Sequence, residues 1–377
     1  MNRAAVVVII GTRPEAIKMA PLIIELKKQE QFDVIVCNTG QHRDMIKPVL
    51  SLFGIAEDHS LNVMTPNQTL SSLTSRLIIE LEKTLVHIKP KLVIVHGDTT
   101  TSFVASLVAF YLQIKVAHVE AGLRTENIFS PFPEEFNRSV NSLVADIHFA
   151  PTDGAKKNLL RENSNRDQNI YVTGNTVIDA LFLCLELGKE NKLPVDKVIL
   201  DWVDPEKMLI LFTGHRRENF GEGFKNIFEA IVHLLNIYGN RIQIIYPVHP
   251  NPNIKKVAHE YFAGYPNVLL TEPLDYVNIV WVINKSYFII TDSGGIQEEA
   301  PSLGKPVLVI RDTTERPEAV EAGTVKLVGS NKETILKYCQ MLIDDQEYYK
   351  SMADAINPYG DGRASQRIVN ILKERFL

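Results

Sequence analysis

The sequence predicts an α/β protein made of two Rossmann-like domains, each built on a doubly wound parallel sheet. Short apolar runs, typical of buried strands, alternate with helical segments, which is the pattern of a parallel sheet with helices on both faces. A chain of 377 residues is too long for one ordinary core and suits two domains. The same alternation starts afresh in the second half of the chain, although no sequence repeat is present.

The first half opens on a segment that is basic and then apolar, like a short signal peptide. The apolar run ends at Gly11 without a cleavage-type sequence, so it predicts a first buried strand instead. Pro14 favours a helix start just after it. The strands expected in this half are Ala4–Ile10, Asp33–Asn38, Leu92–Gly97, Val116–Glu120, Ile147–Ala150 and Ile170–Thr173, and the helices are Glu15–Gln29, Leu70–Ile88, Ser102–Tyr111 and Glu135–Val144.

A polar stretch with two prolines, residues 188–205, marks the entrance to the second domain. We place the boundary near Gly174, which predicts a first domain of residues 1–174, a second of 175–360 and a last helical segment of 361–377. The strands expected here are Met208–Thr213, Ile242–Val248 and Val268–Thr271, and the helices are Asn175–Leu187, Lys225–Tyr238, Lys332–Asp344, Gln346–Ala355 and Ala364–Phe376.

A glycine turn follows a further buried strand that ends at Asp292. Ser293, Gly294 and Gly295 let backbone approach a ligand closely, and a helix is predicted from Ile296 to Leu303, with Gly304 as its stop. Exposed N–H groups at such a helix start form a site for phosphate. Glu298 and Glu299 are expected in its first turn, able to accept from ribose hydroxyls. The alternative is an ordinary turn whose acidic residues complement the helix dipole.

A charged loop comes after the next expected strand, Lys305–Arg311. Arg311 and Arg316 are candidate partners of a pyrophosphate, and the alternative is a solvated charged loop.

Polar side chains also follow the other predicted strands, at the carboxyl edge where open α/β sheets bind ligands. Arg13 and Lys18 flank a helix start in an arrangement suited to an anion. Asp98, Glu120, Glu134 and His215 could face one cleft between the two domains, where they would supply acid/base chemistry. Each of them alone could be a helix cap or a solvated helix end.

Composition and missing motifs exclude several classes. A net charge of −5 argues against a nonspecific nucleic-acid surface. Three widely spaced cysteines without CxxC indicate a reducing cytoplasm and no zinc or disulfide framework. No apolar run approaches membrane-spanning length. The P-loop, the GxSxG and HExxH motifs and a complete dinucleotide fingerprint are also missing, so we expect no metal and no cofactor.

Seven motifs in order resemble the non-hydrolysing UDP-N-acetylglucosamine 2-epimerases, and the match runs nearly end to end. The resemblance implies a GT-B-like fold, with the active site in the cleft between the domains and the last helix crossing back to the first domain. The motifs are Gly11–Lys18, His96–Thr101, His118–Arg124, His215–Asn219, Asp292–Gly304, Arg311–Glu318 and Asn357–Gly362.

The resemblance also implies an isomerase that interconverts UDP-GlcNAc and UDP-ManNAc. UDP is eliminated in the anti sense to give 2-acetamidoglucal and is added back after C2 is reprotonated on the other face. The implied catalytic residues are Asp98, Glu120, Glu134 and His215, with the acid and the base left open. The implied substrate-binding residues are Arg13, Lys18, Arg138, Ser293, Gly294, Gly295, Glu299 for the ribose, and Arg316.

Family members bind a second UDP-GlcNAc as an activator, and Gln41, His42, Arg216 and His249 match positions of that site. Asp44 and Asn67 stand where the activated bacterial enzymes have Gln and Arg. A cytoplasmic homodimer that supplies precursors for surface polysaccharide is implied, with no nucleic-acid or membrane partner. The alternatives are a hydrolysing epimerase that releases ManNAc and UDP, a GT-B glycosyltransferase and a nonenzymatic sugar-nucleotide sensor.

Overall fold

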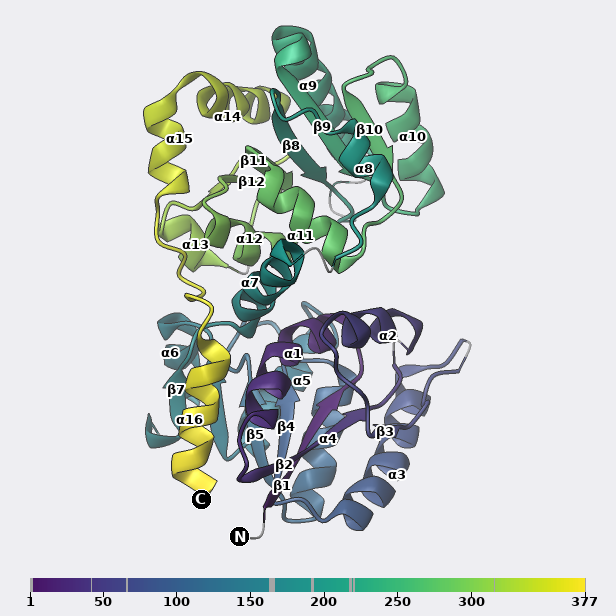
Figure 1. Ribbon diagram of the computed structural model, residues 1–377, viewed down its shortest axis with the longest axis vertical. Helices are drawn as coiled ribbons and strands as arrows, with labels where there is room; N and C mark the ends of the chain where they lie inside the picture. Colours follow the sequence, from purple (N-terminus) through teal and green to yellow (C-terminus); the bar gives the residue numbers. More distant parts are fainter. Residues whose placement is uncertain are drawn as a thin grey trace. The chain divides into compact units, whose positions relative to one another are not determined.

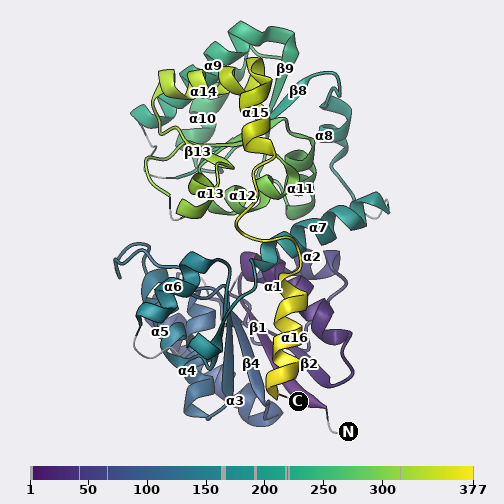
Figure 2. The ribbon, with the colours of Figure 1, turned by 90° about the vertical axis from the view of Figure 1, so that its left-hand side faces the viewer.

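The chain, in a computed structural model, is described at residues 3–41, 43–65, 67–162, 167–190, 193–216, 219, 221–314 and 316–376. It divides into two compact units (Figures 1 and 2). Unit 1 consists of Met1–Leu183 and Tyr359–Leu377, and unit 2 consists of Cys184–Pro358. The domain limits expected from the sequence stay predictions. Among the described residues, no helix has both the length and the apolar character that a membrane crossing needs.

Unit 1 contains a seven-stranded sheet in the order β3-β2-β1-β4-β5-β6-β7, with every pair parallel. The order reverses between β1 and β4, which makes the sheet doubly wound and places a ligand-binding crevice at the carboxyl ends of these two strands. The strands are β1 (Ala4–Ile10), β2 (Phe32–Asn38), β3 (His59–Ser60), β4 (Leu92–His96), β5 (Lys115–Val119), β6 (Ile147–Ala150) and β7 (Ile170–Val172).

The helices of unit 1 cover both faces of this sheet (Figure 2). On α3, Leu73, Leu77, Leu81 and Leu85 repeat every four residues and are all buried, as an amphipathic helix requires. The helices are α1 (Arg13–Lys27), α2 (Arg43–Leu52), α3 (Leu70–Ile88), α4 (Thr100–Tyr111), α5 (Glu134–Val144), α6 (Asp153–Arg161), the first part of α7 (Thr176–Lys189) and α16 (Ala364–Phe376). The sequence does not predict α2, β3 or α6.

The C-terminal helix α16 belongs to unit 1 and packs against α1 (Figure 2). The buried carboxylate of Asp179 holds its start, accepting from the backbone amides of Ala364 at 3.1 Å and Ser365 at 2.7 Å. Gly360 and Gly174 also meet closely there, because a Cβ on Gly360 would lie 3.3 Å from the Cα of Gly174. The chain's last helix is thus fastened to residues nearly two hundred positions earlier.

Unit 2 contains a six-stranded parallel sheet in the order β10-β9-β8-β11-β12-β13, which reverses between β8 and β11. Its core includes Phe212 and Tyr246, whose ring centroids lie 4.3 Å apart. The strands are β8 (Met208–Thr213), β9 (Ile242–Pro247), β10 (Val268–Thr271), β11 (Phe288–Thr291), β12 (Val307–Val309) and β13 (Val325–Leu327).

The helices of unit 2 include several that the sequence does not predict, namely α8, α10, α11 and α13. The full set is the end of α7, α8 (Lys197–Trp202), α9 (Glu222–Tyr238), α10 (Pro252–Phe262), α11 (Tyr276–Lys285), α12 (Gly294–Glu299), α13 (Pro317–Glu321), α14 (Lys332–Asp344) and α15 (Gln346–Ala353).

The helix after the glycine turn begins two residues earlier than expected, at Gly294. Glu298 and Glu299 therefore end α12, and their predicted place in its first turn is wrong. The chain continues as a 3-10 helix over Ala300–Leu303, and Gly304 stops it at φ +64°, as predicted. Glycine reaches this left-handed conformation without a Cβ clash, which is why Gly304 can end the segment.

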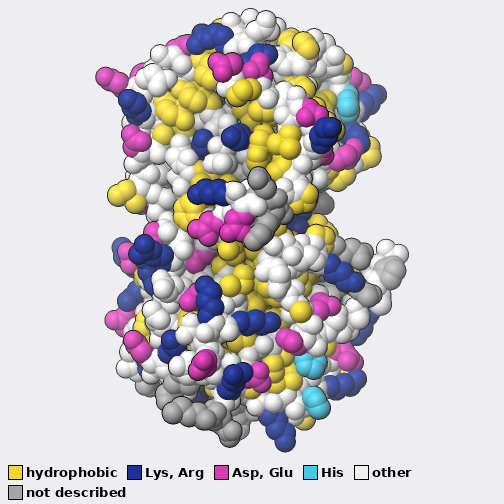
Figure 3. All heavy atoms as spheres, in the orientation of Figure 1, with side chains coloured by type: hydrophobic (Ala, Val, Ile, Leu, Met, Phe, Trp, Pro, Cys, Tyr) yellow, Lys and Arg dark blue, Asp and Glu magenta, His cyan; other side chains and the backbone are white. Residues whose placement is uncertain are grey.

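The surface face shown in Figure 3 carries both signs of charge, with Lys and Arg side chains interspersed among Asp and Glu. A basic patch of the kind that binds nucleic acid does not gather on this face.

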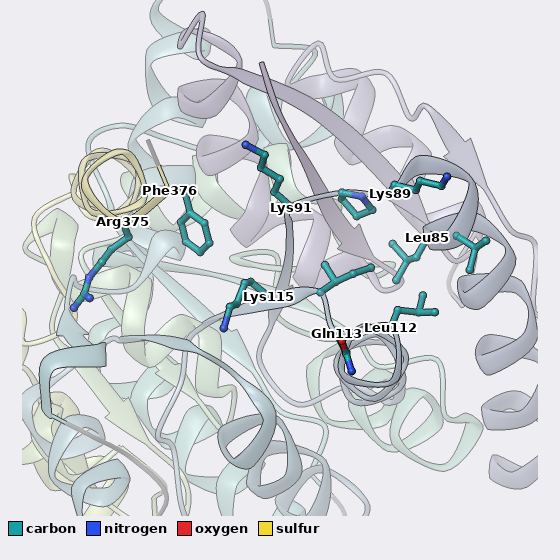
Figure 4. A pocket seen from close by; sticks show the side chains of 11 residues that line it. Leu85, Lys89, Lys91, Leu112, Gln113, Lys115, Arg375 and Phe376 are labelled. Atoms are coloured by element: carbon teal, nitrogen blue, oxygen red, sulfur yellow. The ribbon is translucent and has the colours of Figure 1, made fainter. Parts of the chain in front are cut away.

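A hollow of about 730 Å³ lies at the amino ends of β4 and β5, the edge of the sheet opposite the predicted site (Figure 4). Lys89, Lys91 and Lys115 extend from it in different directions, and none of the candidate residues lines it.

We expect Asp179→Ala to lower the free energy of unfolding of unit 1 by ~1–3 kcal/mol, because two buried amides of α16 would lose a charged acceptor. Hydrogen exchange of unit 1 peptides measures this. Asp33→Ala, at an exposed position of β2, is the control and should stay within about 0.5 kcal/mol. Equal protection of α16 in both variants would contradict the role given to Asp179.

Candidate active site

Glu120 lies at the end of β5, in a buried polar cluster at the carboxyl edge of the unit 1 sheet. Its backbone is left-handed, with φ +59°, an uncommon conformation for a residue with a side chain. Its carboxylate forms an ion pair with Lys18 of α1 and accepts from Asn175 at 2.8 Å, and the His96 ring lies 3.7 Å away. Three separate segments therefore hold this one side chain.

The electrostatics of the cluster keep Glu120 charged. Burial alone would raise its pKa, but the ammonium of Lys18 and the hydrogen bonds from Lys18 and Asn175 outweigh burial and lower the pKa to about 2. Burial lowers the pKa of His96 to about 4, so the imidazole is neutral near neutral pH. Glu120 is thus a proton acceptor in this state, beside a neutral histidine.

Asp98 follows β4 in the neighbouring turn, and its environment acts in the opposite direction. Burial raises its pKa, and the charges of Glu120 and Glu134 add to this, although Arg138 opposes them. Arg138 of α5 pairs with the Asp98 carboxylate at 2.5 Å and with Glu135 at 3.2 Å. The structure therefore brings Asp98, Glu120 and Glu134 within electrostatic reach of one another, with pKa values of Asp98 and Glu120 shifted apart.

Two side chains of helix α5 form hydrogen bonds to the backbone of the turn that carries Asp98. Asn137 donates to the Asp98 carbonyl at 2.8 Å, and Asn141 donates to the Gly97 carbonyl at 3.1 Å. Together with Glu134 and Arg138 they recur at the three- and four-residue spacing of one helix face. This spacing is the signal in the sequence from which Asn137 and Asn141 could have been predicted. The sequence analysis did not name Asn137, Asn141, His96 or Asn175 as site residues.

Unit 2 presents His215 after β8, held by the fully buried Asp292 at the end of β11. One carboxylate oxygen accepts from the backbone amides of His215 at 2.7 Å and Arg216 at 2.8 Å, and the other lies 2.9 Å from the His215 Nδ1. Burial alone would raise the pKa of Asp292, but His215 and these amides outweigh it and lower the pKa. The ionised carboxylate thus orients the ring, a role that the sequence reading did not assign to Asp292.

The His215 ring also stacks on His249, with centroids 6.1 Å apart and planes at 14°. Two predicted residues that follow neighbouring strands of unit 2 are therefore together. Arg216 lies beside them through its backbone bond to Asp292. Gln41, predicted for the activator site, belongs to unit 1 and accepts from Thr101 at 2.9 Å, whereas His42 lies outside the described residues.

The glycine turn of unit 2 is covered by Arg316. A Cβ on Gly294 would lie 2.5 Å from the Arg316 guanidinium, so any other residue at this position would require the arginine side chain to move. Glu298 accepts from Arg316 Nε at 2.7 Å, and Glu299 accepts from the Tyr276 hydroxyl at 2.9 Å. The predicted phosphate and ribose residues are therefore gathered around the turn between β11 and α12.

No group of three or more His, Cys, Asp or Glu side chains suited to a metal ion occurs within the described ranges. His96 lies near the Glu120 carboxylate, and His215 contacts the Asp292 carboxylate and stacks on His249.

Known proteins provide an independent comparison. A family model described as UDP-N-acetylglucosamine 2-epimerase matches residues 24–373. The "UDP-N-acetylglucosamine 2-epimerase" of Campylobacter jejuni is 51% identical over 372 residues, which covers 97% of either chain.

Two solved structures are similar along nearly the whole chain. The UDP-GlcNAc 2-epimerase of Neisseria meningitidis bound to UDP-GlcNAc has a TM-score of 0.88 and 50% identity, covering 98% of this chain and 100% of that one. The enzyme of Methanocaldococcus jannaschii in complex with UDP-GlcNAc and UDP has a TM-score of 0.79 and 35% identity, covering 98% of this chain and 99% of that one. With the two doubly wound sheets, these matches confirm the predicted GT-B-like class of fold.

We expect Asp292→Asn to lower the stability of unit 2 by ~1.5–3 kcal/mol at neutral pH, because two backbone amides lose a charged acceptor. Both tryptophans, Trp202 and Trp281, lie in unit 2, so their fluorescence during urea unfolding measures this unit. Asp201→Asn, exposed on α8, is the control.

The effect should depend on pH in one direction. Since the pKa of Asp292 is lowered from 3.8 in the native state, the stabilisation is present above that value and is lost as the pH falls through the native pKa. A difference between wild type and Asp292→Asn that grows on acidification would refute this assignment.

Proposed function

Because the chain belongs to the UDP-N-acetylglucosamine 2-epimerase family, we propose that it is the non-hydrolysing enzyme, which interconverts UDP-GlcNAc and UDP-ManNAc by inversion at C2. The observation that carries the proposal is the carboxylate cluster of unit 1. Asp98 and Glu120 lie in adjacent turns with pKa values shifted in opposite directions, which is the arrangement that acid/base catalysis needs.

The chemistry follows from the substrate. The proton on C2 has no adjacent carbonyl to acidify it, so direct abstraction is difficult. In the proposed reaction a base takes this proton while the C1–O bond breaks, and the electron pair of the C–H bond becomes the C1–C2 double bond of 2-acetamidoglucal. UDP leaves as the anion. A proton then adds to the other face of C2, and a UDP oxygen re-forms the bond to C1.

The unit 1 residues suit these two proton transfers. Glu120 is ionised and free to accept a proton, whereas Asp98, whose pKa is raised, holds a proton more readily than Glu120 does. Glu134, the first residue of α5, adds a third carboxyl group near Asp98. We therefore propose Glu120 as the base and Asp98 as the acid in one direction of the reaction, with the roles exchanged in reverse.

The unit 2 residues suit the nucleotide. We propose that Ser293, Gly294 and Gly295 offer backbone to the diphosphate, that Arg316 neutralises it and that Glu299 accepts from the ribose. His215, oriented by Asp292, is proposed to bind the departing phosphate oxygen. Arg13 and Lys18 of unit 1 add positive charge for the same anion, and Arg138 binds substrate while it holds Asp98.

Four further expectations stay proposals. We propose a cytoplasmic homodimer that supplies ManNAc-type precursors for surface polysaccharide. We propose a second UDP-GlcNAc bound as an activator by Gln41, His42, Arg216 and His249. A sigmoidal dependence of rate on UDP-GlcNAc concentration would support the activator, and a hyperbolic one would argue against it.

Reaction in deuterated water should place deuterium at C2 of the product while the sugar stays joined to UDP, because the C2 proton exchanges through the carboxyl groups. Mass spectrometry and proton NMR of the separated products measure this, and traces of free UDP and 2-acetamidoglucal should accompany turnover. Product without deuterium at C2 would rule out elimination. Stoichiometric free ManNAc would assign the protein to the hydrolysing class.

In the same assay, Asp98→Asn should slow both turnover and C2 exchange by about a hundredfold, the usual effect of losing a positioned acid or base. Asp33→Asn is the matched control at an exposed strand position. A protein that binds UDP-GlcNAc without any turnover in the wild type would instead be a sugar-nucleotide sensor.

Arg316→Ala should weaken UDP binding by about tenfold to a hundredfold, because it removes a charged donor beside the glycine turn. Isothermal calorimetry with UDP measures this. Arg241→Ala removes an equal charge from an exposed site of unit 2 and should leave UDP affinity unchanged. Equal affinities of the two variants would remove Arg316 from the nucleotide site.

A further inference from the structure

Glu15 is a buried carboxylate that the proposed chemistry does not use. It lies in the first turn of α1, between Arg13 and Lys18, and only 1% of its surface is exposed. A glutamate in this place ordinarily caps its own helix at the surface, where burial is not needed. Its burial therefore requires a separate explanation.

The two carboxylate oxygens of Glu15 accept four hydrogen bonds from two different turns. One oxygen accepts from the Gly11 amide at 3.1 Å and from the amide and hydroxyl of Thr12, both at 2.8 Å. The other accepts from the Thr99 hydroxyl at 2.7 Å. All four groups act as donors to Glu15, and a carboxylate anion is the side chain that only accepts.

The bonds to Thr12 form a capping box, but those to Gly11 and Thr99 do more than cap a helix. Thr99 is 84 positions away, directly after Asp98, and is itself the N-cap of α4. Since β1 and β4 are neighbours in the sheet, their carboxyl-end turns lie side by side. Glu15 thus joins the turn that leads to Arg13 to the turn that carries Asp98.

The backbone at Gly11 is packed closely against the side chains of Thr101 and Thr39. A Cβ on Gly11 would lie 2.2 Å from the Thr101 hydroxyl oxygen and 2.5 Å from that of Thr39. The two hydroxyls are themselves 3.0 Å apart. A shift of either turn is therefore passed to the other through direct contact.

We propose that Glu15 is a positioning residue, which locks the Gly11–Thr12 turn to the Asp98–Thr99 turn and so fixes Asp98 relative to the cationic start of α1. This rests on the proposed function of Asp98 in proton transfer. Misplacing a catalytic group by about 1 Å costs on the order of a hundredfold in rate, so a lock of this kind acts on kcat. Its effect on UDP affinity should be smaller, because only Arg13 and Lys18 of the groups proposed for the diphosphate lie near this lock and the others belong to unit 2.

The test measures kcat, KM and UDP affinity for Glu15→Gln, Thr99→Val and the double variant. Burial raises the pKa of Glu15 to about 7 against the effect of its four donors, so the assays are run at about pH 8, where the anion predominates. We expect each single variant to lower kcat by about tenfold or more and to change UDP affinity by a smaller factor. The double variant should be no slower than the slower single variant, because both variants disturb the same link between the turns: Thr99→Val removes a donor, and Glu15→Gln replaces one accepting oxygen by a donating NH2 group.

Two controls separate positioning from a loss of helix stability. Asn331→Ala removes the N-cap of α14 in unit 2, which should lower the unfolding midpoint to a similar extent without changing kcat. Thr99→Ser keeps the hydroxyl and should recover most of the activity that Thr99→Val loses. Should Glu15→Gln fail to fold, the comparison of Thr99→Val with Thr99→Ser carries the test.

The proposal is overturned by wild-type kcat in both single variants, or by losses of Glu15→Gln and Thr99→Val that multiply in the double variant. Hydrogen exchange gives a readout that does not depend on activity. Glu15→Gln should speed exchange in peptides over residues 8–16 and over 97–104, and an effect confined to 8–16 overturns the link between turns. If the wild type fails to epimerise while this exchange pattern holds, the proposed function fails and the lock stands.

Discussion

The buried ion pair between Lys18 and Glu120 is the constraint on which unit 1 depends. Two charges removed from water cost more than their attraction returns unless further polar groups satisfy them. Here Asn175 donates to the same carboxylate and His96 lies against it as a neutral ring. These partners come from different strands and helices of the sheet. The fold has to be complete before the pair can exist, and the loss of Lys18 would leave the buried Glu120 carboxylate without the countercharge of this pair.

That requirement explains why so many hydrogen bonds hold the turns at the carboxyl edge of the sheet. Glu120 adopts a left-handed backbone conformation, which a glycine at the same position would reach more easily. The hydrogen bonds and ion pair of its side chain compensate for that strain. The next turn is held from two sides, by α5 through Asn137 and Asn141 and by α1 through Glu15. Rigid turns of this kind keep reacting groups in place, at a cost in stability that the hydrophobic strands beneath them offset.

Unit 2 solves a different problem with the same architecture. Its sheet also reverses direction, and its polar residues also follow β8 and β11, the strands on either side of the reversal. Instead of a carboxylate cluster it presents a histidine oriented by a buried aspartate and a glycine turn covered by an arginine. These groups suit an anion, whereas those of unit 1 suit proton transfer. The two halves thus repeat a fold without repeating its chemistry.

Apolar runs predicted the strands of both sheets apart from β3 and β13, and polar residues after those strands predicted Asp98, Glu120 and His215 as candidates, since parallel strands all end at one edge. The sequence did not predict α2, α10 or α11, although Asp275 caps the start of α11. The place of Glu298 and Glu299 was wrong because α12 starts at Gly294, two residues earlier than expected.

Only the tertiary structure decided which partner each charged group has. Local spacing cannot show that Lys18 meets Glu120, that Arg138 meets Asp98 or that Glu15 reaches Thr99, because these pairs are separated by 102, 40 and 84 residues. The same is true of the protonation states. Burial and neighbouring charges shift the pKa values of Asp98 and Glu120 in opposite directions, and both causes arise only when distant segments come together.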